Sequence, residues 1–183
     1  MVRRTLQFTG PKVLASRMVR DYVQKLYRPA AVSSVEAAAD GYAQAKDLAA
    51  WKHRVRDLWH RVTVEHIETG GIGDEPEIGN TLRVKVYAAL GGLGKADVAV
   101  QAIHSRVDAD DRLVNLNFSD LAAAEAYEGD RMRFEGDIPL AHSGPFGYTV
   151  RIVPRHSGLA SAAEMGLVAL PPEGEGMPEG DLR

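Results

Sequence analysis

Several sequence features are missing from this 183-residue chain. It has no cysteine, which excludes disulfides, thiolate nucleophiles and cysteine zinc sites and suits a reducing compartment. No apolar run approaches the ~18 residues of a membrane span. No apolar segment follows the basic start "MVRRTLQFTG", as one would in a signal peptide. We therefore expect a cytoplasmic protein with no membrane partner.

Positive charge is also in short supply. Lysine and arginine number 22 against 25 aspartates and glutamates, and the net charge is -3. Because a phosphate backbone attracts proteins through a positive field, nucleic acid is not expected as a partner. Hydrophobic residues make up 45% and charged residues 26%, close to the globular average, so a domain with a real core is expected.

The N-terminal residues have the spacing of amphipathic helices. Apolar side chains recur every three or four positions over residues 11–27, and Pro29 is expected to end this first helix. Ser33 and Glu36 then have the spacing of a capping box. A second, longer helix is expected to follow, weakened near Gly41.

From Val62 the apolar period changes to two, which predicts strands. Seven segments qualify: 62–68, 81–90, 97–107, 112–118, 131–140, 147–154 and 166–170. No helices are interleaved, so we predict a mainly β fold in which two amphipathic helices precede a seven-stranded antiparallel Ig-like β-sandwich. The side chains expected to face inward are Leu82, Val84, Val86, Val98, Val100, Val114, Leu116, Met132, Phe134, Ile138, Tyr148, Val150 and Ile152.

Motifs with known chemistry are mostly incomplete. "GGLGK", Gly91–Lys95, lacks the flanking glycine and hydroxyl residue of a phosphate loop, so we expect a glycine-rich turn between two strands. The six histidines show no tight ligand spacing, so no metal site is expected. The segment 171–183 is acidic and rich in proline and glycine, and we expect it to be disordered.

Three aromatic residues are candidates for special roles. Tyr148 stands two residues before inward Val150 and follows a Gly-Pro-Phe-Gly bend, which predicts a structural tyrosine corner whose hydroxyl bonds back to the preceding turn. Tyr87 is expected on the outward face of its strand, where a sugar can stack on its ring. Packing against the long helix or a neighbouring domain is favoured over sugar stacking for Tyr87, and the same holds for Trp51.

Four segments in order resemble the C-terminal end of the short, actinobacterial type of bacterial α-glucan (glycogen) phosphorylase. They are "GPKVLASRMVRDYVQKLYRPAA", "LAAWKHRVRDLW", "DVAVQAIHSRVDADDRLV" and "GPFGYTVRIVPRH" followed by "LVAL". The resemblance implies a pyridoxal phosphate (PLP) enzyme of GT-B fold that releases glucose 1-phosphate from α-1,4-glucan. It also implies that the catalytic half and the cofactor lysine lie outside this chain, so no catalytic, cofactor-binding or metal residue is assigned here.

The resemblance also divides the chain. It implies closing helices of the absent catalytic domain at 1–31, a long linker helix at 32–61, the accessory β-sandwich at 62–170 and the tail at 171–183. We expect an accessory region that is inactive alone and partners the rest of the phosphorylase, with α-glucan and a second copy as further partners. A free-standing carbohydrate-binding module and a structural module for subunit contacts are the alternatives. Burial of Tyr87 and Trp51 favours the structural module, and exposure of both favours sugar binding.

Overall fold

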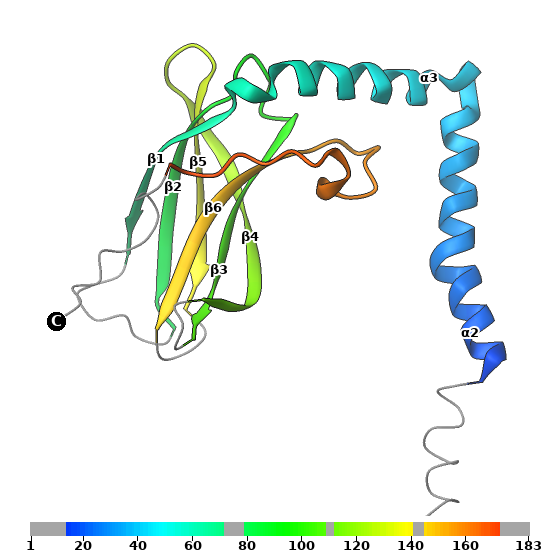
Figure 1. Ribbon diagram of the computed structural model, residues 1–183, viewed down its shortest axis with the longest axis horizontal. Helices are drawn as coiled ribbons and strands as arrows, with labels where there is room; N and C mark the ends of the chain where they lie inside the picture. The colour runs from blue at the N-terminus through cyan, green and yellow to red at the C-terminus, as the bar shows by residue number, and fades with distance from the viewer. Residues whose placement is uncertain (1–13, 72–78, 109–111, 141–144, 173–183) are drawn as a thin grey trace, which may run out of the picture. The chain divides into compact units, whose positions relative to one another are not determined.

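The fold is taken from a computed structural model that describes residues 14–71, 79–108, 112–140 and 145–172. The chain divides into two compact units, Met1–Ala50 and Trp51–Arg183. The first unit is helical where it is described, and the second contains a β-sheet (Figure 1). The tail that we expected to be disordered lies outside the described residues, apart from its first two positions.

The first helical stretch does not end at Pro29, so that prediction is wrong. The helical elements follow each other without a gap: α2 (Ala15–Tyr22), the π-helix η1 (Val23–Tyr27) and α3 (Arg28–Leu58). In the π-helix the Arg28 N–H donates to the carbonyl of Val23, five residues back. Proline lacks an N–H, and its ring crowds the carbonyl four residues back, so a widened turn just before Pro29 lets the helix continue.

The backbone of α3 leaves helical geometry later, at Ala39–Tyr42. Asp40, Gly41 and Tyr42 all have positive φ, between 49° and 65°. The weakness expected near Gly41 is therefore confirmed. The expected capping box is wrong, because Ser33 lies inside the helix and does not begin one.

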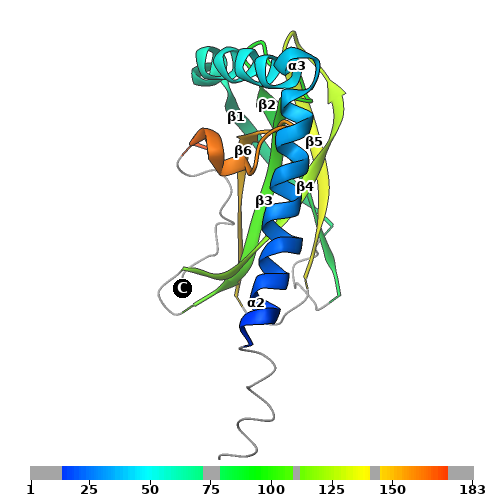
Figure 2. The ribbon, with the colours of Figure 1, turned by 90° about the vertical axis from the view of Figure 1, so that its right-hand side faces the viewer.

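The sheet is antiparallel and contains six strands in the order β1-β2-β5-β4-β3-β6. The strands are β1 (Thr63–Gly70), β2 (Thr81–Ala89), β3 (Val98–Val107), β4 (Leu113–Ala126), β5 (Arg131–Pro139) and β6 (Phe146–Pro154). The first part of β4 pairs with β3, and β4 pairs with β5 only from Ala122 onward. The long strand β4 thereby turns the sheet around a corner, and the sheet curls around its own inner face (Figures 1 and 2).

The mainly β, antiparallel part of the prediction is confirmed, but the number of strands differs. The segment expected as a seventh strand makes only one bridge, in which Ala169 and Ile152 exchange both backbone hydrogen bonds. The six strands form one continuous curled sheet. An Ig-like sandwich stays a prediction.

Most of the expected inward side chains are buried, including Val84, Val86, Val100 and Ile152. Met132 and Tyr148 are only partly buried, and two are exposed, Val114 at 37% and Leu116 at 48%. Between the pairs His104↔Asn117 and Arg106↔Val114, β4 has one residue more than β3. Asn115 in this bulge has φ 58°, and the extra residue interrupts the alternation on which the prediction relied.

The last turns of α3 pack on the turn between β2 and β3. Trp51, Val55 and Trp59, four residues apart, are all buried. Gly91 in the turn has φ 63°, and a Cβ there would lie 2.5 Å from the Arg61 Cβ. The glycines of this segment thus allow a tight turn to approach the backbone that follows the helix, which confirms the turn expected at Gly91–Lys95.

Candidate functional site

The outer surface of β1, β2 and β5 carries a row of aromatic and charged side chains. Strand register places His66, Tyr87, Arg133 and Glu125 side by side across β1, β2, β5 and β4. Inward neighbours of Tyr87 on its own strand, Val86 and Ala88, are buried, so Tyr87 points outward as the alternation predicted. Tyr87 itself is half-buried.

Three rings lie close together on this surface. The Tyr87 ring centroid is 5.6 Å from that of Tyr127 in an edge-to-face arrangement and 5.9 Å from that of His66. Tyr127 follows β4, at the turn into β5, and is 39% exposed. Edge-to-face packing of this kind holds both rings in fixed orientations. We call His66, Tyr87, Tyr127 and the neighbouring Glu65, Arg131 and Arg133 the Tyr87 face.

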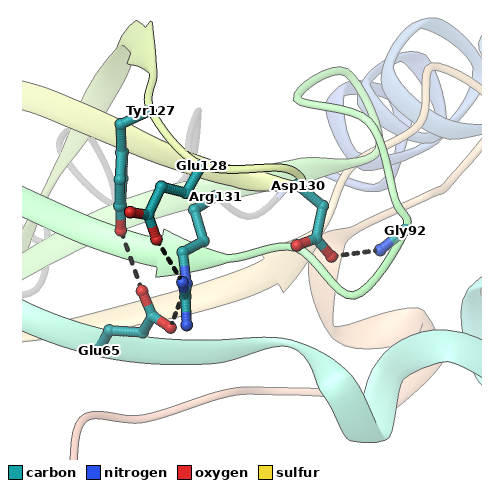
Figure 3. Close-up of polar contacts among 6 residues, drawn as sticks. All are labelled: Glu65, Gly92, Tyr127, Glu128, Asp130 and Arg131. Atoms are coloured by element: carbon teal, nitrogen blue, oxygen red, sulfur yellow. Dashed lines mark hydrogen bonds and ion pairs between the residues drawn. The ribbon is translucent and has the colours of Figure 1, made fainter.

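A polar network fixes the Tyr127 side chain over the sheet. The Tyr127 hydroxyl donates to Glu65 Oε2 at 3.0 Å, and the other oxygen of Glu65 accepts from Arg131 Nε at 2.8 Å (Figure 3). Arg131 also pairs with Glu128 at 2.8 Å. Burial and the hydrogen bond to Glu65 raise the pKa of Tyr127 to about 12, so the phenol stays protonated at neutral pH.

The β4–β5 turn that carries Tyr127 is tied to the turn after β2. Asp130 accepts a hydrogen bond from the Gly92 N–H at 2.9 Å (Figure 3). The Leu90 N–H donates to the carbonyl of the same aspartate at 3.2 Å. These bonds limit the movement of the turn, and they therefore help to hold Tyr127 where it lies.

Sequence reasoning identified Tyr87 but missed Tyr127, Glu65 and Arg131. Tyr127 lies outside the regular alternation of a strand, and Glu65 lies at the register shift between Val64 and His66. The short connection from Tyr127 to Arg131 was the available signal, because the two ends of a tight hairpin turn lie close together. The contact of both with β1 has no local sequence signal.

Trp51 is placed differently from Tyr87. It is 6% exposed, its indole N–H donates to Asp97 Oδ1 at 2.6 Å, and its ring lies 4.7 Å from that of His156. Asp97 also accepts from Arg54 and from the Gly94 N–H. The tryptophan is thus a packing residue between the helix and the turn before β3, and the structure does not bring it to the Tyr87 face.

Tyr148 lies on the inner face of β6, paired with buried His104 of β3. Burial raises its pKa, while a side-chain hydrogen bond with Thr69 of β1 acts in the opposite direction. Residues 141–144 of the preceding turn lie outside the described part of the chain, so the tyrosine corner stays a prediction.

The outer surface of β3, β4 and β6 has a different character. Leu116 and Phe118 are about half exposed on β4, and the Arg151 guanidinium lies 4.7 Å from the centre of the Phe118 ring. Gln101 bridges Arg151 and Asp120 by hydrogen bonds of 3.0 and 2.8 Å. This surface combines exposed apolar side chains with the linked polar groups of Arg151, Gln101 and Asp120, whereas the Tyr87 face has several ion pairs.

Two searches of the described residues have negative results. Within the described ranges, no three His, Cys, Asp or Glu side chains are grouped so as to hold a metal ion. No helix in the described part of the chain is both long and apolar enough to cross a membrane.

Comparison with known proteins gives a consistent result. Residues 59–172 match the family model described as the glycogen phosphorylase C-terminal domain. The chain is 42% identical over 170 residues to a glycogen phosphorylase of Mycobacterium tuberculosis (strain CDC 1551 / Oshkosh), and 41% identical to one of Mycobacterium bovis. It is 26% identical over 172 residues to a maltodextrin phosphorylase of Thermococcus litoralis.

These alignments cover 92–93% of this chain but only 20% of each relative. The chain therefore spans about a fifth of the length of the curated relatives that it matches. The family model alone covers more than half of the chain, including all six strands. The chain belongs to the glycogen phosphorylase C-terminal domain family.

Proposed function

We propose that this chain serves as the C-terminal accessory region of an enzyme that phosphorolyses α-1,4-glucan to glucose 1-phosphate. The observation that carries the proposal is the 42% identity over 170 residues to a mycobacterial glycogen phosphorylase. In this proposal the reaction takes place in the preceding part of a longer polypeptide, and the sheet domain contributes to assembly or presents the substrate. A cytoplasmic location follows from this role and suits the cysteine-free sequence.

PLP supplies acid–base chemistry through its phosphate in such an enzyme, but the contacts of the lysines here do not fit a cofactor carrier. Lys52 pairs with Glu164 at 2.5 Å, and Lys85 pairs with Glu68 at 3.8 Å. Lys46 donates to the Gly41 carbonyl. Each of these three ammonium groups is engaged by an oxygen of the chain itself. We therefore assign no cofactor residue among them.

The proposal divides the chain into closing helices of the catalytic domain at 1–31, a linker helix at 32–61, an accessory domain with an Ig-like sandwich at 62–170, and a tail at 171–183. The exposed apolar side chains of α2, such as Met18 and Tyr22, support the first of these divisions. They give the helix a surface that suits packing against the preceding catalytic domain. The same surface suits a second copy of the chain.

The test compares this chain with a longer phosphorylase polypeptide that contains it. A coupled assay for glucose 1-phosphate, with glycogen and inorganic phosphate, is run beside an absorbance scan for a bound Schiff base. We expect both signals from the longer protein and neither from residues 1–183 alone. Turnover by the isolated chain would overturn the accessory role, and no turnover by a longer protein that carries PLP would overturn the reaction.

A further inference from the structure

We infer that the Tyr87 face is a contact surface for α-glucan. The inference rests on the proposed function, because the phosphorylase reaction supplies the class of ligand. It adds a place where that ligand is held, on a domain that has no catalytic residue assigned. Three properties of the described side chains favour a neutral sugar polymer here.

The first property is the ring surface. Tyr127 is 39% exposed, and its ring meets the half-buried ring of Tyr87 edge to face at 5.6 Å. Because the two rings pack edge to face, their flat faces point in different directions, and one of the two rings stands out from the sheet. The apolar face of a pyranose packs on such a ring in the same way as other C–H groups do. The curved chain of an α-1,4-glucan suits a stepped surface better than a flat one.

The second property is the supply of hydrogen-bonding groups at the edge of the rings. Glu65, Glu128 and Arg131 form a linked series beside Tyr127, and Arg133 lies next to Tyr87 with Glu125 and Glu135 as its ion-pair partners. A carboxylate accepts several hydrogen bonds and a guanidinium donates up to five, so paired groups keep capacity for the hydroxyls of a sugar. A few polar groups around an apolar platform are typical of small-molecule sites.

The third property is that these groups are already held in place. The Tyr127 hydroxyl is fixed by Glu65, and the turn behind it is fixed by the bonds between Asp130 and the β2 turn. Side chains ordered before binding lose less conformational entropy when a ligand arrives. The surface therefore needs little rearrangement to accept a sugar.

Charge decides which class of ligand suits the surface. The carboxylates of Glu65, Glu125, Glu128 and Glu135 outnumber the guanidinium groups of Arg131 and Arg133. An anionic ligand such as a phosphate ester is repelled by this excess of negative charge. A neutral polyhydroxyl compound is not, so the face suits unmodified glucan better than a phosphorylated sugar.

The outer surface of β3, β4 and β6 offers a matched comparison with the Tyr87 face. Phe118 is an exposed aromatic residue there, but an arginine covers its ring and its strand neighbour Leu116 is apolar. Gln101, Asp120 and Arg151 supply polar groups there too, so the comparison isolates the ring, which Arg151 covers. If any exposed aromatic side chain were enough to bind glucan, Phe118 would serve as well as Tyr127.

The experiment uses the 183-residue chain itself. Its mobility is measured in native gels with and without glycogen, and its affinity for maltoheptaose by titration calorimetry. We expect retardation by glycogen, and a rise in the dissociation constant of roughly five-fold or more in Tyr127→Ala, the scale of one lost ring contact. The dissociation constant of Tyr127→Phe, which keeps the ring, is expected to lie between those of the unmodified chain and of Tyr127→Ala. Phe118→Ala is expected to bind as the unmodified chain does. Circular dichroism confirms that each variant is folded.

Failure of this inference is distinct from failure of the proposed function. No binding by the folded, unmodified chain would overturn the Tyr87 face as a glucan surface, even where the longer protein phosphorolyses glycogen. Equal loss in Phe118→Ala and Tyr127→Ala would overturn it as well. The proposed reaction fails only if a longer protein that carries PLP shows no turnover in the phosphorolysis assay, whatever the glucan affinity of this chain.

Discussion

His104 is a titratable side chain on the inner face of the sheet. It is 7% exposed, and its Nε2 lies 3.0 Å from the Ser119 hydroxyl oxygen. Tyr148 faces it from β6, and the Phe146 ring lies 6.0 Å away. Burial lowers the pKa of His104 from its usual value of 6.5, because the charged imidazolium is poorly solvated there.

This burial predicts a pH dependence of stability. Below pH 6.5 the unfolded chain binds a proton at His104 that the folded chain does not bind, so the free energy of unfolding falls as pH drops from 6.5 toward the folded pKa. Above pH 6.5 this contribution is constant. Urea unfolding at about pH 7.5 and about pH 5.5 measures the change. The His104→Gln substitution is expected to reduce this difference in the free energy of unfolding between the two pH values. The substitution of exposed His53, His53→Gln, is expected to leave the difference unchanged. An equal pH dependence in His104→Gln would contradict the prediction.

Single residues also show where sequence reasoning stops. The outward direction of Tyr87 follows from alternation along β2 alone, and the structure confirms it. The partners of Tyr87 do not follow from alternation, since Tyr127 and Glu65 reach it from a turn and from a register shift in another strand. Contacts of that kind depend on which strands are neighbours, and strand order has no local signature.

At the scale of elements, the end of α3 and the 3-10 helix that follows it, η2 (Trp59–Arg61), contain two buried tryptophans with different surroundings. Trp51 donates its indole N–H to Asp97 at 2.6 Å. The Trp59 indole N–H is buried and has no hydrogen-bond partner among the described residues. The two side chains are almost equally buried, at 6% and 7% exposed, so their hydrogen bonds are the main difference between them.

This difference predicts unequal effects of the same substitution. Trp51→Phe removes a bond to a carboxylate and leaves Asp97 with fewer donors, so we expect a loss of about 1.5–3 kcal/mol beyond the change in packing. Trp59→Phe removes an unpaired polar group. Its loss of unfolding free energy is therefore expected to be smaller than that of Trp51→Phe by about 1.5–3 kcal/mol. Denaturant unfolding of the two variants measures both values. Equal losses would show that the bond to Asp97 contributes nothing net.

Two elements differ from expectation for reasons that are local in the structure but not visible in the sequence. A proline normally ends a helix, yet the π-helix Val23–Tyr27 absorbs Pro29. A regular alternation normally shows which face is buried, yet one extra residue at Asn115 turns Leu116 outward. In both cases the insertion of a single residue into a regular hydrogen-bond pattern changes the outcome, and hydrophobic period cannot reveal such an insertion.

At the scale of the whole molecule, the chain's composition and period predicted the antiparallel sheet, while the resemblance predicted the family. Neither the period nor the resemblance predicted the curl of the sheet, because the curl depends on the two pairing partners of β4. The family membership gives this geometry a context. The chain corresponds to about a fifth of its relatives, and under the proposed function the exposed apolar surface of α2 and η1 is expected to be covered in a longer protein.

The apolar stripe of α2 and η1 allows that expectation to be tested. Its side chains are between 44% and 56% exposed: Leu14, Met18, Val19, Tyr22, Val23 and Leu26. Burying one such side chain contributes on the order of 1.5–3 kcal/mol, so the isolated chain is expected to self-associate through the stripe at concentrations of roughly tens of micromolar. Sedimentation of the unmodified chain and of the double variant Met18→Gln/Leu26→Gln measures this, with Val168→Gln as an exposed apolar control.

The double variant should be monomeric and the control should associate as the unmodified chain does. In the longer protein the same double substitution is expected to lower the midpoint of thermal unfolding, because the proposal places the stripe against the catalytic domain. A monomeric unmodified chain, together with an unchanged midpoint in the longer protein, would mean that the stripe stays in water in both. The exposed side chains of α2 would then give no support to the boundary proposed at residue 31.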